Sequence, residues 1–179
     1  ANVLNNILTN NRVGITLVGS KNDLISGNVI TNSTTYGINP YVSYESRDFS
    51  IIGNTITESG NYDIFPYFIC NLNATVRDNI GSGNRAIKFF ENQRYVSLQD
   101  EELSQLILCN TDYSYFTNIV VDGSPNKTNN GIFLQNTDNS FFVNIVSSDN
   151  QVGVYERGVY VDGANSIENN TFSNVVANS

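Results

Sequence analysis

Short apolar runs separated by polar turns recur along the whole chain, and most of them follow an Asn that precedes two mostly aliphatic residues. Taking that Asn as the anchor of each copy gives steps of 22, 26, 25, 39, 26 and 30 residues between copies. Two positions after the anchor the residue is aliphatic in six copies of seven, and three positions before it the residue is apolar in six of seven. Such shared columns indicate an internal repeat. The anchors are Asn6, Asn28, Asn54, Asn79, Asn118, Asn144 and Asn174.

A second short apolar strand follows most anchors, as in VGITL at 13–17, YGINP at 36–40, YDIFP at 62–66 and VGVYE at 152–156. A unit of this size without a helix cannot bury its own apolar face, whereas stacked copies can. Strands that wind in one sense pair in parallel. The pattern therefore predicts an all-β fold, a right-handed parallel β-helix of about seven coils, with residues 1–179 as one domain. A β-sandwich would instead need hairpins between successive strands, which the regular anchors do not fit.

The anchor Asn has an expected role at a corner of each coil. It tolerates strained backbone angles there, and its amide can bond to the same amide one rung away, which would form an asparagine ladder. The aliphatic side chains two positions later are then expected to lie in one inward file, made of Ile30, Ile56, Val120, Val146 and Val176.

The step of 39 residues exceeds its neighbours, and its surplus lies near residues 85–105. There AIKFF and RYVSL flank the short polar link ENQ, which predicts a hairpin that leaves the coil. Arg85, Lys88, Glu91 and Arg94 gather on this excursion as the most catalytic-looking group, although a salt-bridged hairpin explains them equally well.

Composition supports strands and turns. The chain has 30 Asn, 31 Ser plus Thr, no His and no Met. Asn favours turns over helices, and the apolar residues are mainly β-formers. A net charge of −8 argues against nucleic acid as a partner. No apolar run approaches the roughly 18 residues of a membrane span, so no membrane insertion is expected. We predict no catalytic residue and no cofactor, because the commonest general base is missing and the acids are dispersed.

The repeats resemble the Asn-rich coils of the carbohydrate-binding and sugar-hydrolase (CASH) repeat family, and more closely the NosD-like group of envelope proteins linked to copper-site maturation. The run from SGNRAIKFF to LILCN is similar to that group's habit of interrupting the coils and resuming on an apolar strand near Cys-Asn. The resemblance implies a β-helix, and an extracellular or cell-surface location. Copper handling would need His, Met or several Cys, which this chain lacks.

Cys70 and Cys109 each lie nine residues before an anchor, which would place them on adjacent rungs. A Cα separation near 5 Å at that spacing is within the range of a disulfide. An extracytoplasmic location favours the bond, and two buried reduced thiols are the alternative.

Two further columns of polar residues remain open in meaning. Asp48, Asp112, Asp138 and Glu168 each lie six residues before an anchor, where they could bind Ca²⁺ or, together with Asn22 and Asn73, form a solvated turn. Four sequons for N-glycosylation occur, at Asn32, Asn73, Asn126 and Asn169, of which Asn126 is the first choice because it lies in a predicted exposed loop.

Two functional hypotheses follow. The chain is either a structural envelope or extracellular protein, as a segment of a longer rod or as a subunit that associates end to end, or it is a module that binds or processes glycans. The second hypothesis rests on aromatic residues that could stack on sugar rings, namely Tyr36, Tyr41, Tyr44, Tyr62, Phe65 and Tyr67.

Overall fold

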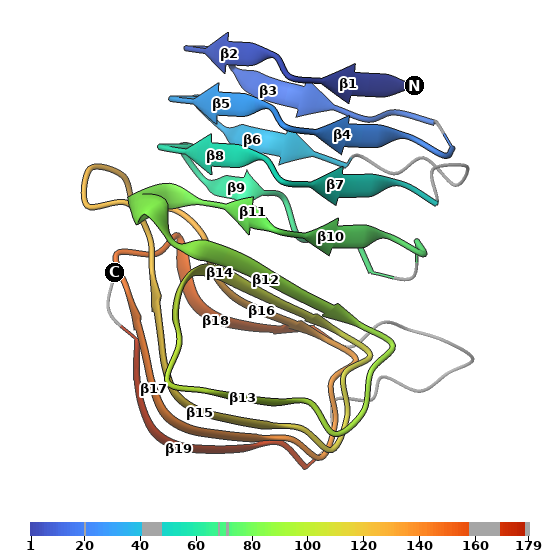
Figure 1. Ribbon diagram of the computed structural model, residues 1–179. Helices are drawn as coiled ribbons and strands as arrows, with labels where there is room; N and C mark the ends of the chain where they lie inside the picture. Colours follow the sequence, from blue (N-terminus) through green and yellow to red (C-terminus); the bar gives the residue numbers. More distant parts are fainter. Residues whose placement is uncertain (20, 41–47, 68, 71, 158–168, 178–179) are drawn as a thin grey trace.

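The computed structural model describes residues 1–19, 21–40, 48–67, 69–70, 72–157 and 169–177. It is an all-β structure in which nearly all strand pairs are parallel, as the repeat predicts. The strands form two stacks of right-handed coils that meet in the middle of the molecule (Figure 1). Among the described residues, no helix is long and apolar enough to cross a membrane.

The first stack has three faces, each a short parallel sheet (Figure 1). One face pairs β1 (Asn2–Leu4), β4 (Leu24–Ser26), β7 (Ser50–Ile52) and β10 (Thr75–Arg77). The second pairs β2 (Ile7–Thr9), β5 (Val29–Thr31), β8 (Thr55–Thr57) and β11 (Asn79–Ile80), and the third pairs β3 (Val13–Thr16), β6 (Tyr36–Asn39) and β9 (Tyr62–Ile64).

The registers of these sheets place equivalent aliphatic residues above one another. Val3, Ile25, Ile51 and Val76 form one file on the first face. Ile30 pairs with Ile56 on the second face, and both side chains are fully buried. Because each side chain rests on its equivalent in the next coil, a three-residue strand can contribute to a continuous core.

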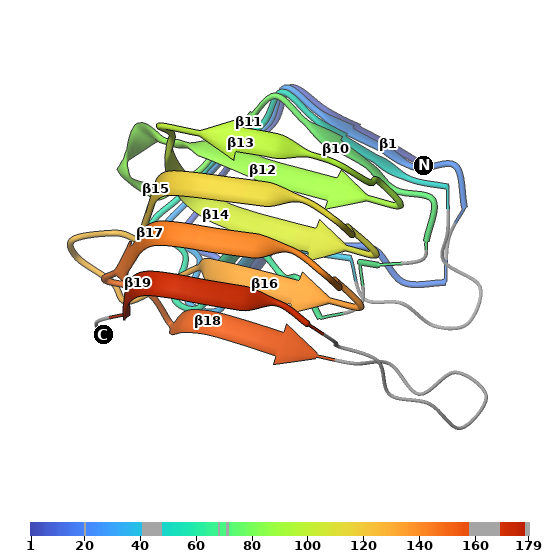
Figure 2. The ribbon, with the colours of Figure 1, turned by 90° about the horizontal axis from the view of Figure 1, so that it is seen from below.

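The second stack has two main faces. One pairs β12 (Ala86–Glu91), β14 (Glu102–Cys109), β16 (Gly131–Gln135) and β18 (Val152–Arg157). The other pairs β13 (Ser97–Gln99), β15 (Tyr115–Asp122), β17 (Phe141–Ser148) and β19 (Thr171–Ala177). The coils of the first stack follow one another down Figure 1, whereas those of the second stack overlap there and separate in Figure 2. The two stacks therefore extend in different directions.

The strands β14 and β16 form a wall that serves two cores. Ile107, Cys109 and Phe133 belong to the core of the first stack, while Leu106, Leu108 and Ile132 belong to that of the second. The wall thus covers the last coil of the first stack. This double burial explains why LSQLILC and GIFLQ lack the polar alternation of a half-exposed strand.

The region near residues 85–105 differs from the predicted hairpin. The strands β12 and β13 do not pair with each other but run parallel to β14 and β15. The antiparallel pair is β11 with β12, joined by the 3₁₀ turn Ser82–Asn84 in which Gly83 has a φ of +66°. The prediction of a local excursion was wrong because these residues reverse the chain and begin the second stack.

The predicted single inward file was also wrong beyond Ile56. In the second stack Ile119 and Ile145 are buried, whereas Val146 and Val176 are 38% and 48% exposed. Here the anchor Asn lies within a strand instead of before one, so the residue two positions later points outward. The buried aliphatic residue therefore lies two positions after the anchor Asn in the first stack and one position after it in the second.

Candidate functional site

The first four anchors form an amide ladder that is exposed at Asn6 and buried at Asn28, Asn54 and Asn79. The Nδ2 atoms of Asn6, Asn28 and Asn54 donate to the Oδ1 atom of the next anchor at 3.0, 2.9 and 3.0 Å, ending at Asn79. Each of these Oδ1 atoms also accepts the backbone N–H of the preceding anchor, at 2.9, 2.9 and 3.0 Å. From Asn28 to Asn79 the ladder is a continuous line of hydrogen-bonded polar groups inside the first stack.

The remaining three anchors form a second, exposed ladder. Asn174 donates to Asn144 at 3.1 Å, Asn144 to Asn118 at 3.0 Å, and Asn118 to Asp100 at 2.8 Å. All four residues have φ between 52° and 55°, whereas none of the first four anchors has a positive φ. The left-handed backbone turns these amides to the outer surface.

A different file takes the inward position in the second stack. The Oγ atom of Ser114 accepts from the backbone N–H of Val96, that of Ser140 from Ser114, and Oδ1 of Asn170 from Ser140, each at 3.0 Å. Sequence reasoning missed this file because Ser replaces Asn in two of its members. Their position directly before the strands β15, β17 and β19 is the signal that identifies them.

Cys70 and Cys109 form a disulfide with a Cα separation of 5.3 Å. Cys109 is the last residue of β14, so the bond ties the segment after β9 to the shared wall. The bond is buried, since the two residues are 6% and 0% exposed.

Asp63 is the centre of a buried polar junction between the stacks. Its carboxylate accepts hydrogen bonds from the backbone N–H and hydroxyl of Ser82 at 2.7 and 3.0 Å, and from the hydroxyl of Ser104 at 3.1 Å. Asn129 and Asn130 donate from their Nδ2 atoms at 3.3 and 2.7 Å. Burial raises the pKa of the Asp63 carboxyl, and the bonds from Ser82 and Asn130 oppose part of that rise.

The loop 123–130 holds this junction from the second stack. Asn130 also donates its backbone N–H to Asn61 at 2.8 Å, and Lys127 donates to the backbone oxygen of Glu58 at 2.6 Å. Arg85 forms a 3.0 Å ion pair with Asp122 at the start of the loop. The side chains of this loop therefore connect the second stack to coils of the first stack. Asn129 and Asn130, which bond to Asp63, follow it in the sequence by 66 and 67 residues.

The described rings of the predicted aromatic face pack against one another and against the second stack. The rings of Tyr36 and Phe65 are 4.5 Å apart, and the ring of Tyr67 lies 5.3 Å from that of Phe133 in the shared wall and 5.1 Å from that of Tyr155 in β18. Tyr62 is 8% exposed. Burial and its hydrogen bond to Tyr67 raise the pKa of Tyr62 far above its usual range. Tyr41 and Tyr44 lie outside the described residues.

The predicted catalytic-looking group is dispersed. Arg85 pairs with Asp122, Lys88 lies 3.7 Å from Glu101, and Arg94 lies 3.6 Å from Asp112. The remaining member, Glu91, accepts the backbone N–H of Ala74 at 3.2 Å. The four side chains therefore interact with four different partners instead of one shared site.

The acidic column is also separated. Asp48 accepts from Asn73 at 2.7 Å in the first stack, and Asp112 accepts the backbone N–H of Asp138 at 3.2 Å in the second. Glu168 lies outside the described residues. Within the part of the chain that the structure describes, no three His, Cys, Asp or Glu side chains are grouped closely enough to hold a metal ion.

The four sequon residues are all exposed. The amides of Asn32, Asn73 and Asn169 bond to a neighbouring rung, at Asn10, Asp48 and Asn139. Asn126 instead lies in the loop 123–130, where its amide is 3.4 Å from Glu58.

An exposed aromatic corner was not predicted from the sequence. Tyr95 and Tyr113 are 74% and 48% exposed and stack with ring centroids 5.7 Å apart and an interplanar angle of 28°. Both have a positive φ, of 59° and 51°. A bulky residue rarely adopts this backbone, which costs roughly 1–2 kcal/mol for each residue. The register places Asn139 and Asn169 at the same position in the next two rungs, where both also have a positive φ. In the sequence, a Tyr at a turn position that holds Asn in other repeats is the signal that could have identified this corner.

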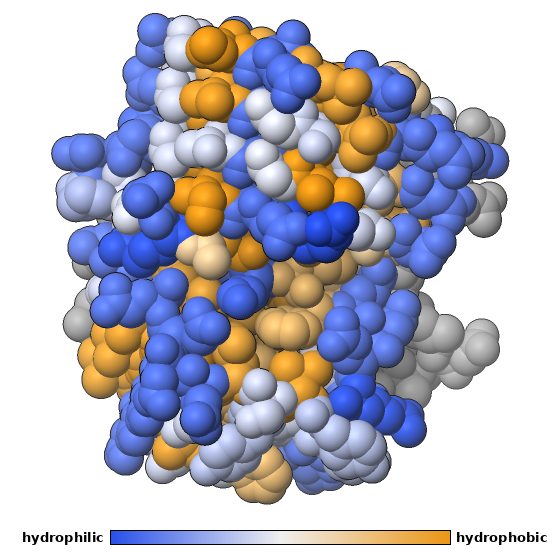
Figure 3. All heavy atoms as spheres, in the orientation of Figure 1, coloured by the Kyte–Doolittle hydropathy of each residue, from blue (hydrophilic) through white to orange (hydrophobic). Residues whose placement is uncertain are grey.

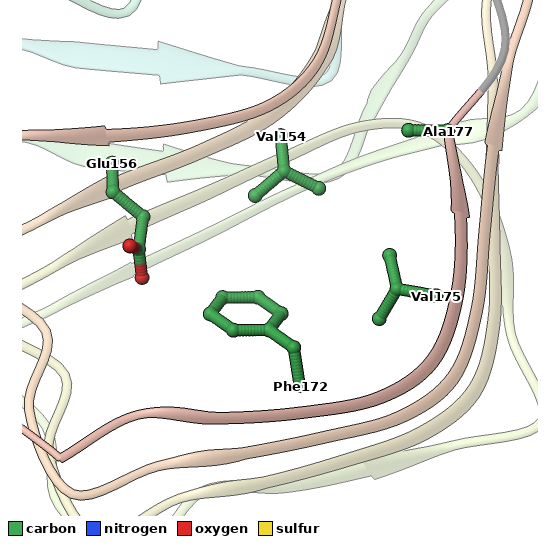
Figure 4. Close-up of a pocket in the computed structure, with 5 residues that line it drawn as sticks. All are labelled: Val154, Glu156, Phe172, Val175 and Ala177. Atoms are coloured by element: carbon green, nitrogen blue, oxygen red, sulfur yellow. The ribbon is translucent and has the colours of Figure 1, made fainter.

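An open apolar hollow lies at the end of the second stack (Figure 4). Val154, Phe172, Val175 and Ala177 line it together with Glu156, whose carboxylate accepts a 3.3 Å bond from Asn170. At the other end of this stack, Figure 3 shows apolar atoms between β12 and β13, where Phe90 and Leu98 are half-buried.

Comparison with known proteins gives one family match. Residues 1–67 match the family described as periplasmic copper-binding protein (NosD). No curated protein and no solved structure matches the chain. The matched part is the first stack up to the residues after β9. The family is a parallel β-helix family whose description is periplasmic, which agrees with the fold and with a location outside the cytoplasm.

Copper binding does not fit the residues of this chain. Copper prefers imidazole, thioether and thiolate ligands. The chain has no His and no Met, and its two Cys are joined in the disulfide. The similarity in the first stack therefore supports the parallel β-helix fold.

Proposed function

We propose that this protein is a structural scaffold of the cell envelope. In this proposal the two β-helical stacks meet at a rigid bend, the elbow, and the edge strands β1, β2 and β3 of the first stack associate with a second copy of the chain. The main support is continuity: one hydrogen-bonded sheet runs from β2 to β19 through both stacks. The described side chains that the sequence offered as a catalytic group form ion pairs and hydrogen bonds with separate partners instead.

The elbow is fixed by three independent connections. The Asp63 network joins β9 to the loop 123–130, the disulfide joins the segment after β9 to β14, and Lys127 of the loop donates to the backbone oxygen of Glu58. Gln105 of the wall adds a bond from its amide to the backbone oxygen of Ile64 at 2.8 Å. Because these groups are buried or half-buried, bending the elbow would break bonds that water does not readily replace.

The proposed association uses the first coil. The strands β1, β2 and β3 each end their sheets, and Leu4 and Ile7 are 43% and 76% exposed. No charged residue occurs in β1 or β2, although natural edge strands usually carry a charge or a Pro that prevents pairing. In the inner rungs the Oδ1 atoms of Asn28 and Asn54 each accept two N–H groups. The equivalent Oδ1 atom of Asn6 accepts none from the described residues.

Sedimentation velocity over a range of concentrations tests this association. We expect reversible oligomers from the wild-type chain, and we expect Ile7→Lys to remain monomeric with an unchanged Tm because the side chain already lies in water. The matched control is Val18→Lys, which changes another exposed aliphatic residue outside the strands. Monomers of the wild-type chain at every concentration, or oligomers that survive Ile7→Lys, would refute the proposal.

Glycan binding through residues 36–67 is less well supported than the scaffold. The described rings of that segment pack against one another and against the shared wall, so their faces are largely occupied.

A further inference from the structure

The backbone holds two phenols side by side at the exposed aromatic corner. Tyr95 lies in the turn from β12 to β13 and Tyr113 in the turn from β14 to β15, and both turns are on the right of the second stack in Figure 2. The backbone N–H of Tyr95 donates to the oxygen of Asp112 at 3.0 Å, and that of Asp112 donates to Gln93 at 3.0 Å. These bonds fix the register of the two turns, so the two side chains start one rung apart.

The two rings are close together and also accessible. Their centroids are 5.7 Å apart with an interplanar angle of 28°, and Tyr95 and Tyr113 are 74% and 48% exposed. A reagent in solution can therefore reach both phenols while the rings remain next to each other.

The next two rungs show that the turn does not require Tyr. Asn139 and Asn169 occupy the same column with φ of 52° and 58°, and Asn tolerates the left-handed backbone better than Tyr does. Asn169 also donates to Asn139 at 3.3 Å. What Tyr adds at this column is a phenol beside a second phenol.

The composition of the chain concentrates oxidation on tyrosine. The sequence has no Met, no Trp and no His, and its two Cys are joined in the disulfide, so the thioether and thiol groups that oxidants usually attack are missing. Tyr115 is exposed, but its ring neighbour is Phe141. The described Tyr residues at the junction are buried or half-buried, namely Tyr36, Tyr62, Tyr67 and Tyr155.

We propose that Tyr95 and Tyr113 are a site of oxidative cross-linking, at which hydrogen peroxide and a haem peroxidase join the two rings as dityrosine. Each phenol gives one electron and its hydroxyl proton to the peroxide and becomes a phenoxyl radical. The two radicals couple through a carbon–carbon bond between ortho positions, and the hydrogens on those carbons move to the oxygens and restore both phenols. Two phenols and one hydrogen peroxide thus give one biphenol and two waters, and the chain loses two hydrogen atoms.

The cross-link would pin the first rung of the second stack. The short strand β13 follows Tyr95 and pairs with β15, which follows Tyr113. A covalent bond between the two turns restricts the unfolded chain between residues 95 and 113 and so raises the stability. Because both rings already stack within one chain, coupling inside the chain is favoured over coupling between chains.

Oxidation of the dilute chain by a haem peroxidase and hydrogen peroxide tests the site. We expect the monomer isolated afterwards to show dityrosine fluorescence, an intact mass lower by two hydrogen atoms and a higher Tm. After reduction of the disulfide and cleavage at Glu101 and Glu102, which lie between the two Tyr residues, the peptides that carry Tyr95 and Tyr113 should remain joined.

The variants Tyr95→Phe and Tyr113→Phe each keep an aromatic ring and remove one phenol. Each is expected to lose nearly all of the dityrosine fluorescence and to show no rise in Tm after the same treatment. The matched control is Tyr115→Phe, which removes another exposed phenol and should give the wild-type yield.

Three results would overturn the proposal: no dityrosine in the monomer, a cross-link that maps to other Tyr residues, or a yield that survives Tyr95→Phe. Both phenols belong to one chain, so none of these results depends on whether the first coil associates with a second copy.

Discussion

Replacing Asn54 by Ala should be among the most damaging single changes in the first stack. Asn54 is 1% exposed and is an inner member of the buried ladder. Its Oδ1 atom accepts from the backbone N–H and the Nδ2 of Asn28, both at 2.9 Å. Its Nδ2 atom donates to Asn79 and to the backbone oxygen of Ile25, both at 3.0 Å.

The expected cost follows from the groups that Ala leaves without a partner. The side chain of Asn28 keeps its bond to Val3, but its backbone N–H loses the acceptor that Asn54 supplied. The carbonyl of Ile25 loses the Asn54 donor. An unsatisfied buried group costs about 1–3 kcal/mol, so two of them predict a loss of roughly 2–6 kcal/mol in the free energy of unfolding. Since a domain of this kind has about 5–15 kcal/mol in total, the variant should lose a large fraction of its stability.

Urea denaturation followed by circular dichroism measures this loss. The matched control is Asn144→Gly in the exposed ladder, which keeps a residue suited to a φ of 53° and removes bonds that water can replace. We expect the control to cost less than about 1 kcal/mol, since water compensates exposed groups. Equal costs for the two variants would show that burial does not distinguish the ladders, and the assignment of the first ladder as a structural element would fail.

Three further predictions concern the junction and the first stack. Reduction of the Cys70–Cys109 disulfide, which closes a segment of 39 residues, should lower the stability by about 4 kcal/mol, and the double Ser variant should show the same Tm with and without reductant. Because burial raises the native pKa of Asp63, the native state holds more protons than the unfolded chain above about pH 4, so the contribution of this group to stability should fall as the pH rises from there. Asp63→Asn should flatten this dependence in thermal unfolding between pH 4 and 8, and identical profiles would contradict the assignment. Gly37→Ala should lower the free energy of unfolding by about 1–3 kcal/mol, because its Cβ would lie 2.1 Å from Ile56 Cγ2 and 2.6 Å from the backbone oxygen of Asp63. In the control Gly53→Ala the new Cβ meets nothing within 4 Å, and only the φ of +64° opposes the change.

The sequence predicts the coil but not the number or direction of the stacks. The periodicity of Ile25, Ile51 and Val76 identifies a parallel file, because stacking is the only way in which such short strands bury an apolar face. The wall strands β14 and β16 give no comparable signal. Their double burial follows from a chain reversal at residues 82–84, and a short Gly-containing turn is compatible with either a hairpin or a new coil.

The buried junction could not be predicted for a related reason. Asp63, Ser82 and Asn130 come from separate coils, and their convergence depends on how the second stack meets the first. A single Asp between apolar neighbours, as in YDIF, is a visible anomaly, since a strand with all three residues buried rarely contains a carboxylate. That signal identifies the residue as one that needs partners without indicating which ones.

The two amide ladders show what a repeat motif leaves undetermined. Asn28-Val-Ile and Asn118-Ile-Val are nearly the same tripeptide, yet the first places its amide in the core and the second places it in water. The difference is the sign of φ at the Asn, which Asn permits in either case. In the second stack Ser114 and Ser140 supply the inward acceptors. The amides of Asn118 and Asn144 are not needed there and lie on the outer surface. In both stacks a side-chain oxygen directly before or at the start of a strand accepts the backbone N–H of the preceding rung, so this position, rather than the most frequent motif, determines which polar side chains face the core.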